Sequence, residues 1–267
     1  MVANYEKNMF FSRSQPTKEH WRCSKVYIDE SWVNVRGSGE LLLVGGLFCP
    51  PGNNIESKLE ELRNKLECID TLHSSNLSGE KQVELAKSYI AAFKESGARF
   101  RVIVLPKLRT SFAQYCNNEN WRMVVKAIKL VLLHCYLSNS KDIRLIRPKL
   151  IIEKDEDYQV NFESLQREII SSLSVSEKFY DEEIFRVKPT PIVILSEKRS
   201  FESLQLVDLL LSIIKWDIIN PSGDKETFWL ECKKILAVDQ PRNATRWSTA
   251  EKMNVWKFNG CEQIFTF

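Results

Sequence analysis

Apolar residues follow two different spacings along this chain, one typical of buried strands and the other typical of amphipathic helices. Short apolar runs bounded by turn residues predict strands at Lys25–Ser31, Glu40–Cys49, Phe100–Leu105, Lys149–Glu153 and Ile184–Leu195, the last broken or divided around two prolines. Apolar positions that recur every three or four residues predict helices at 55–68, 80–95, 120–137, 162–173 and 201–216. Strands that alternate with helices indicate a central sheet covered on both faces, which is an α/β fold.

The order of these segments also predicts how the chain is organised. A turn at Arg36–Gly39 makes an antiparallel hairpin of the first two strands plausible. No segment has the composition of a linker, so we expect one domain over residues 1–267, with a core at about 25–216 and a helical or irregular extension at 217–267.

Composition excludes several classes of protein. The chain has 267 residues, of which 43% are hydrophobic and 27% charged, as in ordinary globular proteins. It contains no run of about 18 apolar residues and no apolar core of a secretory signal near Met1, so we expect a cytoplasmic protein without a membrane partner. The net charge of +3 is too small to identify a nucleic-acid partner.

The cysteines and glycines argue against other kinds of site. The seven cysteines are scattered without a C-x-x-C pair and the chain has three histidines, which favours reduced, packed thiols over disulfides or structural zinc. No glycine-rich phosphate-binding loop is present, so a nucleotide-binding metabolic enzyme is disfavoured.

Candidate chemistry comes from acids in apolar surroundings. Asp208 interrupts the most apolar helical stretch, Ser203–Trp216, and Asp29 closes an apolar strand. A buried carboxylate costs several kcal/mol unless a partner or a metal compensates its charge. Glu153 and Asp155 end a later strand, and side chains at the carboxyl ends of strands converge in α/β sheets. Such a cluster would suit Mg²⁺ or Mn²⁺ and a phosphoryl reaction.

Each of these acids also has a structural interpretation. Asp29 can accept backbone hydrogen bonds in a turn, and the run around Asp155 can be a solvated loop. Asp208 can belong to a core salt bridge. Gln205 lies one helical turn before Asp208 and faces the same way, which favours a functional polar face on this helix.

Four segments together resemble the bacterial and phage family catalogued as domain of unknown function 3800. They are Tyr27-Ile-Asp-Glu-Ser31, Leu43-Val-Gly-Gly-Leu47, Leu72-His-Ser-Ser75 and Leu204-Gln-Leu-Val-Asp-Leu-Leu210. The last motif is the most specific, and the resemblance covers roughly residues 25 to 216.

The resemblance implies a ribonuclease H-like fold and a metal-dependent nuclease acting on DNA or RNA, in a mobile element or in defence against phage. In that family the carboxylates hold two ions about 3.5–4 Å apart to hydrolyse a phosphodiester. The implied site residues are Asp29, Glu153 and Asp208 as metal ligands, Asp155 as a further ligand, and Glu30 and His73 as catalytic neighbours.

The chain departs from the family pattern in three places. Trp32 replaces a usual glycine, Thr71-Leu-His73 replaces a segment that contains glutamate, and Glu153 stands where Asp is commoner. The second change removes a candidate ligand. His73 could transfer protons or could be an ordinary surface residue. The competing hypothesis is therefore an inactive ribonuclease H-like module that binds nucleic acid or a protein partner, and the sequence does not indicate the oligomeric state.

The last fifty or so residues lie outside the resemblance. Aromatic and basic side chains alternate there, a mixture that suits either stacking on nucleic-acid bases or packing against the domain. The aromatic residues are Phe228, Trp229, Trp247, Trp256 and Phe258.

Overall fold

Six strands form one mixed sheet in the order β5-β4-β1-β2-β3-β6. The computed structural model describes residues 21–35, 39–106, 116–117, 119–137, 143–176, 192–219, 224–236 and 253–257. The strands are β1 (Trp21–Val35), β2 (Gly39–Cys49), β3 (Arg99–Pro106), β4 (Ile143–Glu153), β5 (Ile192–Ser196) and β6 (Met253–Lys257).

The directions of the strands place two of the predicted acids side by side. β2 is antiparallel to both β1 and β3, whereas β4 is parallel to β1 and β5 is parallel to β4. Ile28 of β1 is the register partner of Ile152 of β4, so Asp29 and Glu153 are the next residues on adjacent parallel strands. β4 ends there, while β1 continues to Val35.

Alternation along the strands divides the core into two clusters. Tyr27 and Ile151 belong to one cluster, and Ile28 and Ile152 belong to the other. Successive side chains on a strand point to opposite faces. Asp29 therefore lies on the face of Tyr27 and Ile151.

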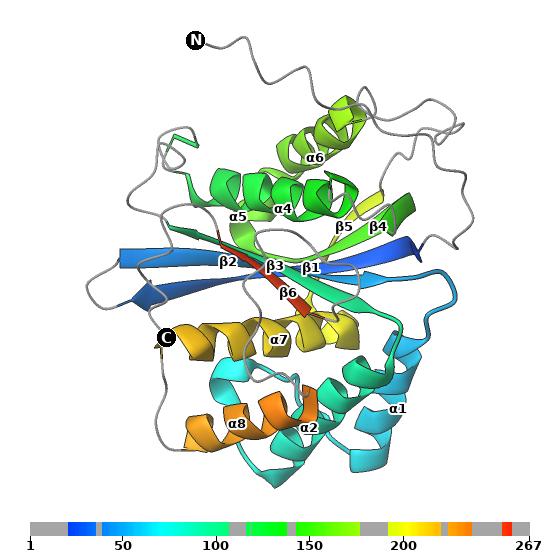
Figure 1. Ribbon diagram of the computed structural model, residues 1–267, viewed down its shortest axis with the longest axis vertical. Coiled ribbons are helices and arrows are strands. Elements are labelled where there is room, and N and C mark those ends of the chain that lie inside the picture. Colours follow the sequence, from blue (N-terminus) through cyan, green and yellow to red (C-terminus); the bar gives the residue numbers. More distant parts are fainter. Residues whose placement is uncertain are drawn as a thin grey trace, which may run out of the picture.

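Helices cover both faces of the sheet (Figure 1). One face is covered by α4 (Asn120–Leu137), α5 (Glu156–Val160) and α6 (Phe162–Ser176). The other is covered by α7 (Glu202–Ile219), and α1 (Ile55–Leu66), α2 (Glu80–Glu95) and α8 (Asp224–Leu236) pack beyond it. Two short 3-10 helices, η1 (Ser74–Asn76) and η4 (Lys198–Ser200), each contact Asp208 of α7. Lys198 of η4 also contacts Asp29 of β1.

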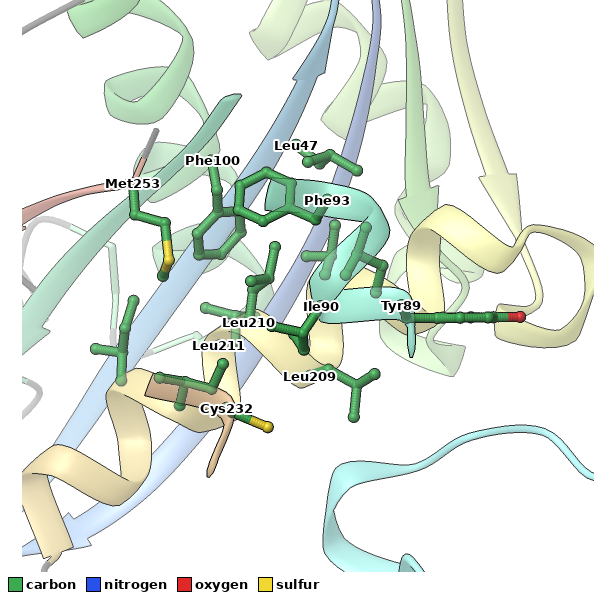
Figure 2. Packing of buried hydrophobic residues seen from close by; sticks show 14 of the residues in the cluster. Leu47, Tyr89, Ile90, Phe93, Phe100, Leu209, Leu210, Leu211, Cys232 and Met253 are labelled. Atoms are coloured by element: carbon green, nitrogen blue, oxygen red, sulfur yellow. The ribbon is translucent and has the colours of Figure 1, made fainter. Parts of the chain in front are cut away.

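α7 is apolar on nearly all sides because it lies between the sheet and the outer helices. Figure 2 shows its leucines in one cluster with Phe100 of β3, Phe93 of α2 and Cys232 of α8. Gly45 of β2 allows this close approach, because a Cβ atom there would lie 2.9 Å from Leu211 and 2.6 Å from Phe100. The glycine in the middle of the sheet thus sets the height of α7 above it.

The predicted fold class, an α/β mixed sheet flanked by helices, is confirmed. The hairpin of β1 and β2 is also confirmed. β1 and β4 are longer than expected. The C-terminal segment 217–267, predicted to be helical or irregular, also contributes a sixth strand, β6, which pairs with β3. The predicted turn residues 36–38 and strand residues 184–191 lie outside the described residues. Within the part of the chain that is described, no helix is long and apolar enough to cross a membrane.

Candidate functional site

Three of the predicted acids meet around one ammonium group. The Nζ atom of Lys198 lies 3.2 Å from Asp29 Oδ2, 2.9 Å from Glu153 Oε2 and 3.7 Å from Asp208 Oδ2. We call Asp29, Glu153, Asp208 and Lys198 the acid cluster. Its members come from β1, β4, α7 and η4, which are far apart in sequence. The structure thus brings together the three acids that the resemblance placed at the centre of the site.

The strands hold two of the carboxylates rigidly. Asp29 and Glu153 occupy neighbouring positions at the point where β4 ends and β1 continues alone on that side. The apolar pattern predicted that Asp29 closes its strand, but Asp29 lies inside β1, which continues to Val35. The backbone after Glu153 is fixed because the Lys154 N–H donates to the Ser196 carbonyl at 2.8 Å.

Burial disfavours the ionised form of Asp29. The residue is 2% exposed, and desolvation raises its pKa well above the usual range, against the opposing effect of Lys198. Burial alone would also raise the pKa of Glu153, but a hydrogen bond from the Asp29 carboxyl and the ammonium of Lys198 lower it. Two close buried carboxylates do not readily both ionise. Desolvation thus favours the neutral form of Asp29, whereas the neighbours of Glu153 favour its ionised form.

The carboxylate of Asp208 is held by Ser74, the first residue of η1. The Ser74 backbone N–H donates to its Oδ2 atom at 2.8 Å, and the Ser74 hydroxyl donates to its Oδ1 atom at 3.1 Å. The Ser212 hydroxyl, one turn further along α7, donates to Ser74. Both carboxylate oxygens of Asp208 are thus oriented by Ser74.

Gln205 supports the residues before Ser74 and does not join the acid cluster. Its Oε1 atom accepts hydrogen bonds from the Leu72 N–H at 2.7 Å and from Arg63 at 2.6 Å. Arg63 also donates to the carbonyls of Cys68 and Asp70. The polar face of α7 predicted from Gln205 and Asp208 therefore contacts residues 72–74 on one side and Lys198 on the other.

The remaining predicted residues lie outside the acid cluster. Glu30 follows Asp29 on the strand, so it faces the opposite side of the sheet, where it accepts a hydrogen bond from the Tyr158 hydroxyl at 2.5 Å. Desolvation raises the pKa of Glu30 to about 7. Asp155 is exposed and caps α5 by accepting the Asp157 N–H at 2.8 Å. His73 is exposed, and it lies near enough to Glu153 to favour the ionised carboxylate.

Sequence reasoning missed Lys198. It lies in Ser196-Glu-Lys-Arg-Ser200, which reads as an ordinary polar connection between a strand and a helix. The available signal was indirect, because three buried acids require a buried cation and a lysine ten residues before Asp208 was within reach.

The donor chemistry of the acid cluster suits a hard cation. Its three carboxylates offer oxygen ligands, and the buried Oδ2 atom of Asp29 faces the same ammonium as the other two acids. In the arrangement observed, the described residues include no group of three or more His, Cys, Asp or Glu side chains that could hold a metal ion. The ammonium of Lys198 lies where the three carboxylates converge.

Comparison with known proteins adds a distant structural likeness. No family model and no curated protein matches the chain, so membership of the family named domain of unknown function 3800 stays a prediction. The chain is similar to a chain in the solved structure of the PCNA:RNase HII complex from Archaeoglobus fulgidus. The two are 14% identical with a TM-score of 0.41, over 72% of this chain and 71% of that one. A likeness of this degree assigns no activity.

Proposed function

We propose that this protein hydrolyses phosphodiester bonds of DNA or RNA with the help of a divalent cation, Mg²⁺ or Mn²⁺, held by Asp29, Glu153 and Asp208. One observation carries the proposal: carboxylates from two parallel strands and a late helix converge within 4 Å of a single point. Rigid elements of this kind hold functional groups in fixed positions at the carboxyl ends of strands.

The electrostatics of the acid cluster support this interpretation. Three carboxylates face one ammonium, and the pKa of Asp29 is raised first by desolvation and further by Glu153 and Asp208, against the opposing effect of Lys198. A divalent cation would favour the ionised form of all three groups. When bound, it would supply Lewis-acid catalysis to a phosphodiester.

The chain's own residues have distinct tasks in this proposal. Asp29 and Glu153 fix the position of the cation on the sheet, and Ser74 orients Asp208 toward it. His73 is exposed near Glu153, where its imidazole would transfer protons to or from bound substrate or water. Glu30 and Asp155 have no part, because their carboxylates bond to Tyr158 and to the N-terminus of α5.

One observation favours the second candidate, an inactive module that binds nucleic acid or a protein partner. Lys198 already forms ion pairs with all three acids, which is how a structural ion network would be built. Under this alternative the acid cluster stabilises the fold and the surface provides the function.

Cleavage assays separate the two candidates. Labelled single- and double-stranded DNA and RNA are incubated with the protein in Mg²⁺, Mn²⁺ or chelator, using wild type, Asp29→Asn, Glu153→Gln and Asp208→Asn. Glu60→Gln, which changes an exposed acid on α1, is the matched control. We expect cation-dependent cleavage that each cluster substitution lowers by more than about 100-fold, since even groups that only orient metal ligands contribute about 10–100-fold.

Two results would reject the proposed function. Cleavage that survives the three cluster substitutions would place the activity elsewhere. Inertness with every substrate and cation, together with retained binding of nucleic acid, would establish the inactive module.

A further inference from the structure

Lys198 has an unusual set of contacts for a lysine. Its side chain is 10% exposed, and its ammonium pairs with three carboxylates from three different elements. A lysine ammonium is positively charged at neutral pH, and here it lies within 4 Å of all three acids. An ammonium in this position occupies the place that the oxygen ligands would offer to a metal ion.

The ion pairs of Lys198 differ from an ordinary buried salt bridge of this protein. Lys233 pairs with one carboxylate, Asp217, at 3.0 Å, and its ammonium also lies 4.3 Å from the centre of the Trp229 ring. That arrangement matches one cation with one anion. Around Lys198, by contrast, three carboxylates from three different elements face one ammonium.

The backbone of Lys198 has contacts of its own, separate from those of its side chain. The Lys198 carbonyl accepts hydrogen bonds from Gln205 Nε2 and from the Phe201 N–H, each at 3.4 Å. Its four-carbon stem is flexible and its ammonium is strongly hydrated in water. The neighbouring Arg199 is exposed and pairs with Glu197, so η4 borders solvent.

We propose that Lys198 is a built-in competitor for the divalent-cation site: its ammonium holds the three carboxylates together without a metal, and a divalent ion binds only by displacing it. This inference rests on the proposed function, because it concerns the same acid cluster. It adds that the affinity for the cation is set by a residue that is not a ligand.

Removing the competitor should strengthen cation binding. An ammonium within 4 Å of all three carboxylates opposes a second positive charge at the same place, and the opposition disappears with the charge. Replacement by arginine keeps the charge and should keep the competition.

The experiment measures Mn²⁺ binding by calorimetry, with the metal alone as the probe, in wild type, Lys198→Met and Lys198→Arg. Lys215→Met is the matched control, because Lys215 is also a half-buried lysine beside the site, and its one described contact is the Ser31 hydroxyl at 3.5 Å. We expect Lys198→Met to bind Mn²⁺ at least about tenfold more tightly than wild type, with Lys198→Arg and Lys215→Met close to wild type.

Thermal denaturation provides a second measurement. In chelator, Lys198→Met leaves three carboxylates without their cation, so its melting temperature should lie below that of wild type. Mn²⁺ should raise the melting temperature of Lys198→Met more than that of wild type. If the methionine variant does not fold in chelator, recovery of folding on addition of Mn²⁺ would give the same answer.

The outcomes distinguish this inference from the proposed function. Cation-dependent cleavage by wild type together with unchanged or weaker Mn²⁺ binding by Lys198→Met would overturn the competitor role and leave the nuclease standing. Tight binding by Lys198→Met with an inert wild type would support the competitor and reject the nuclease function of the natural chain. No Mn²⁺ binding by any variant would overturn the inference, and the cleavage assay would then decide the function independently.

Discussion

Ser74 contributes more to the site than its small side chain suggests. It donates two hydrogen bonds to Asp208, one from its backbone and one from its hydroxyl, and it accepts a third from Ser212. Ser74 is itself 9% exposed, so these bonds lie in surroundings where water does not easily replace them.

Ser74→Ala removes the two hydroxyl bonds and keeps the backbone bond. Leaving buried partners unsatisfied costs about 1–3 kcal/mol, so we expect the free energy of unfolding to fall by that amount in urea denaturation. Ser75→Ala, which alters the exposed neighbouring serine, should have little effect. Equal stability of the two variants would show that the hydroxyl does not orient Asp208.

The acids of the site could be predicted from the sequence, whereas their partners could not. Asp29 and Asp208 are conspicuous because each interrupts an apolar run, and a charge there requires compensation. Ser74 and Lys198 lie in polar segments where their residue types are ordinary. The resemblance implies Glu30 as a catalytic neighbour of Asp29, but adjacent residues of a strand face opposite sides of the sheet, and Glu30 contacts Tyr158.

At the scale of elements, α1 and α7 are joined by a buried ion network. Glu56 of α1 accepts the N–H groups of Glu202 and Ser203 at the start of α7, at 2.7 and 2.9 Å. Arg63 binds the Glu202 carboxylate through two nitrogens at 2.6 and 2.8 Å, and the Tyr89 hydroxyl adds a third bond at 2.6 Å. The network fixes the beginning of the helix that carries Asp208.

Arg63→Met should destabilise the protein strongly, because it leaves Glu202 buried without its cation. Breaking a buried pair from one side costs about 3–5 kcal/mol, which chemical denaturation would measure. Lys58→Met on the same helix is the control, since its ion pair with Glu95 is exposed and should contribute little. A small effect of Arg63→Met would mean that Tyr89 and the helix N-terminus satisfy Glu202 without it.

Gly45→Ala tests the contact between α7 and the sheet. The added Cβ atom would lie 2.6 Å from Phe100 and 2.9 Å from Leu211, and overpacking of a core costs about 1–3 kcal/mol. Gly97→Ala should be nearly neutral, because no neighbouring atom lies closer than 3.5 Å. Thermal denaturation of both variants measures this difference in stability. A Gly45→Ala variant with the melting temperature of wild type would show that α7 can shift on the sheet to accommodate the added methyl group.

The elements themselves differ in how clearly the sequence indicates them. α1 and α2 have regular apolar spacing, and the structure confirms both close to the expected bounds. β6 is short and has only Met253 and Val255 as buried apolar positions among its described side chains, so its pairing with β3 could not be inferred locally. A short strand at a sheet edge depends on its partner more than on its own composition.

At the scale of the whole molecule, the thiols are packed as apolar side chains. The five cysteines among the described residues, Cys23, Cys49, Cys68, Cys116 and Cys232, are buried and form no disulfide. This confirms for these residues the expected packing as small apolar side chains. Desolvation raises the pKa of the Cys232 thiol to about 12 and also raises that of Cys116.

Cys232 should therefore resist alkylation in the folded protein. A thiol reacts as its thiolate, and burial disfavours that form as well as access. Treatment with iodoacetamide at pH 8, followed by peptide mass spectrometry, should leave Cys232 unmodified, whereas the denatured chain should be labelled. Labelling of the native protein at Cys232 within minutes would show that α8 opens readily.

The acid cluster joins parts of the chain that are made at very different times. Ser74 and Asp208 alone are separated by 134 positions, and Asp29 precedes both. Closing such long loops is entropically costly and slows folding, so the pocket forms only when α7 docks on the sheet. Under the proposed function, a nascent chain, a partly folded intermediate or a proteolytic fragment without this helix is catalytically silent, and nucleic acids near the ribosome meet the activity only after the fold is finished.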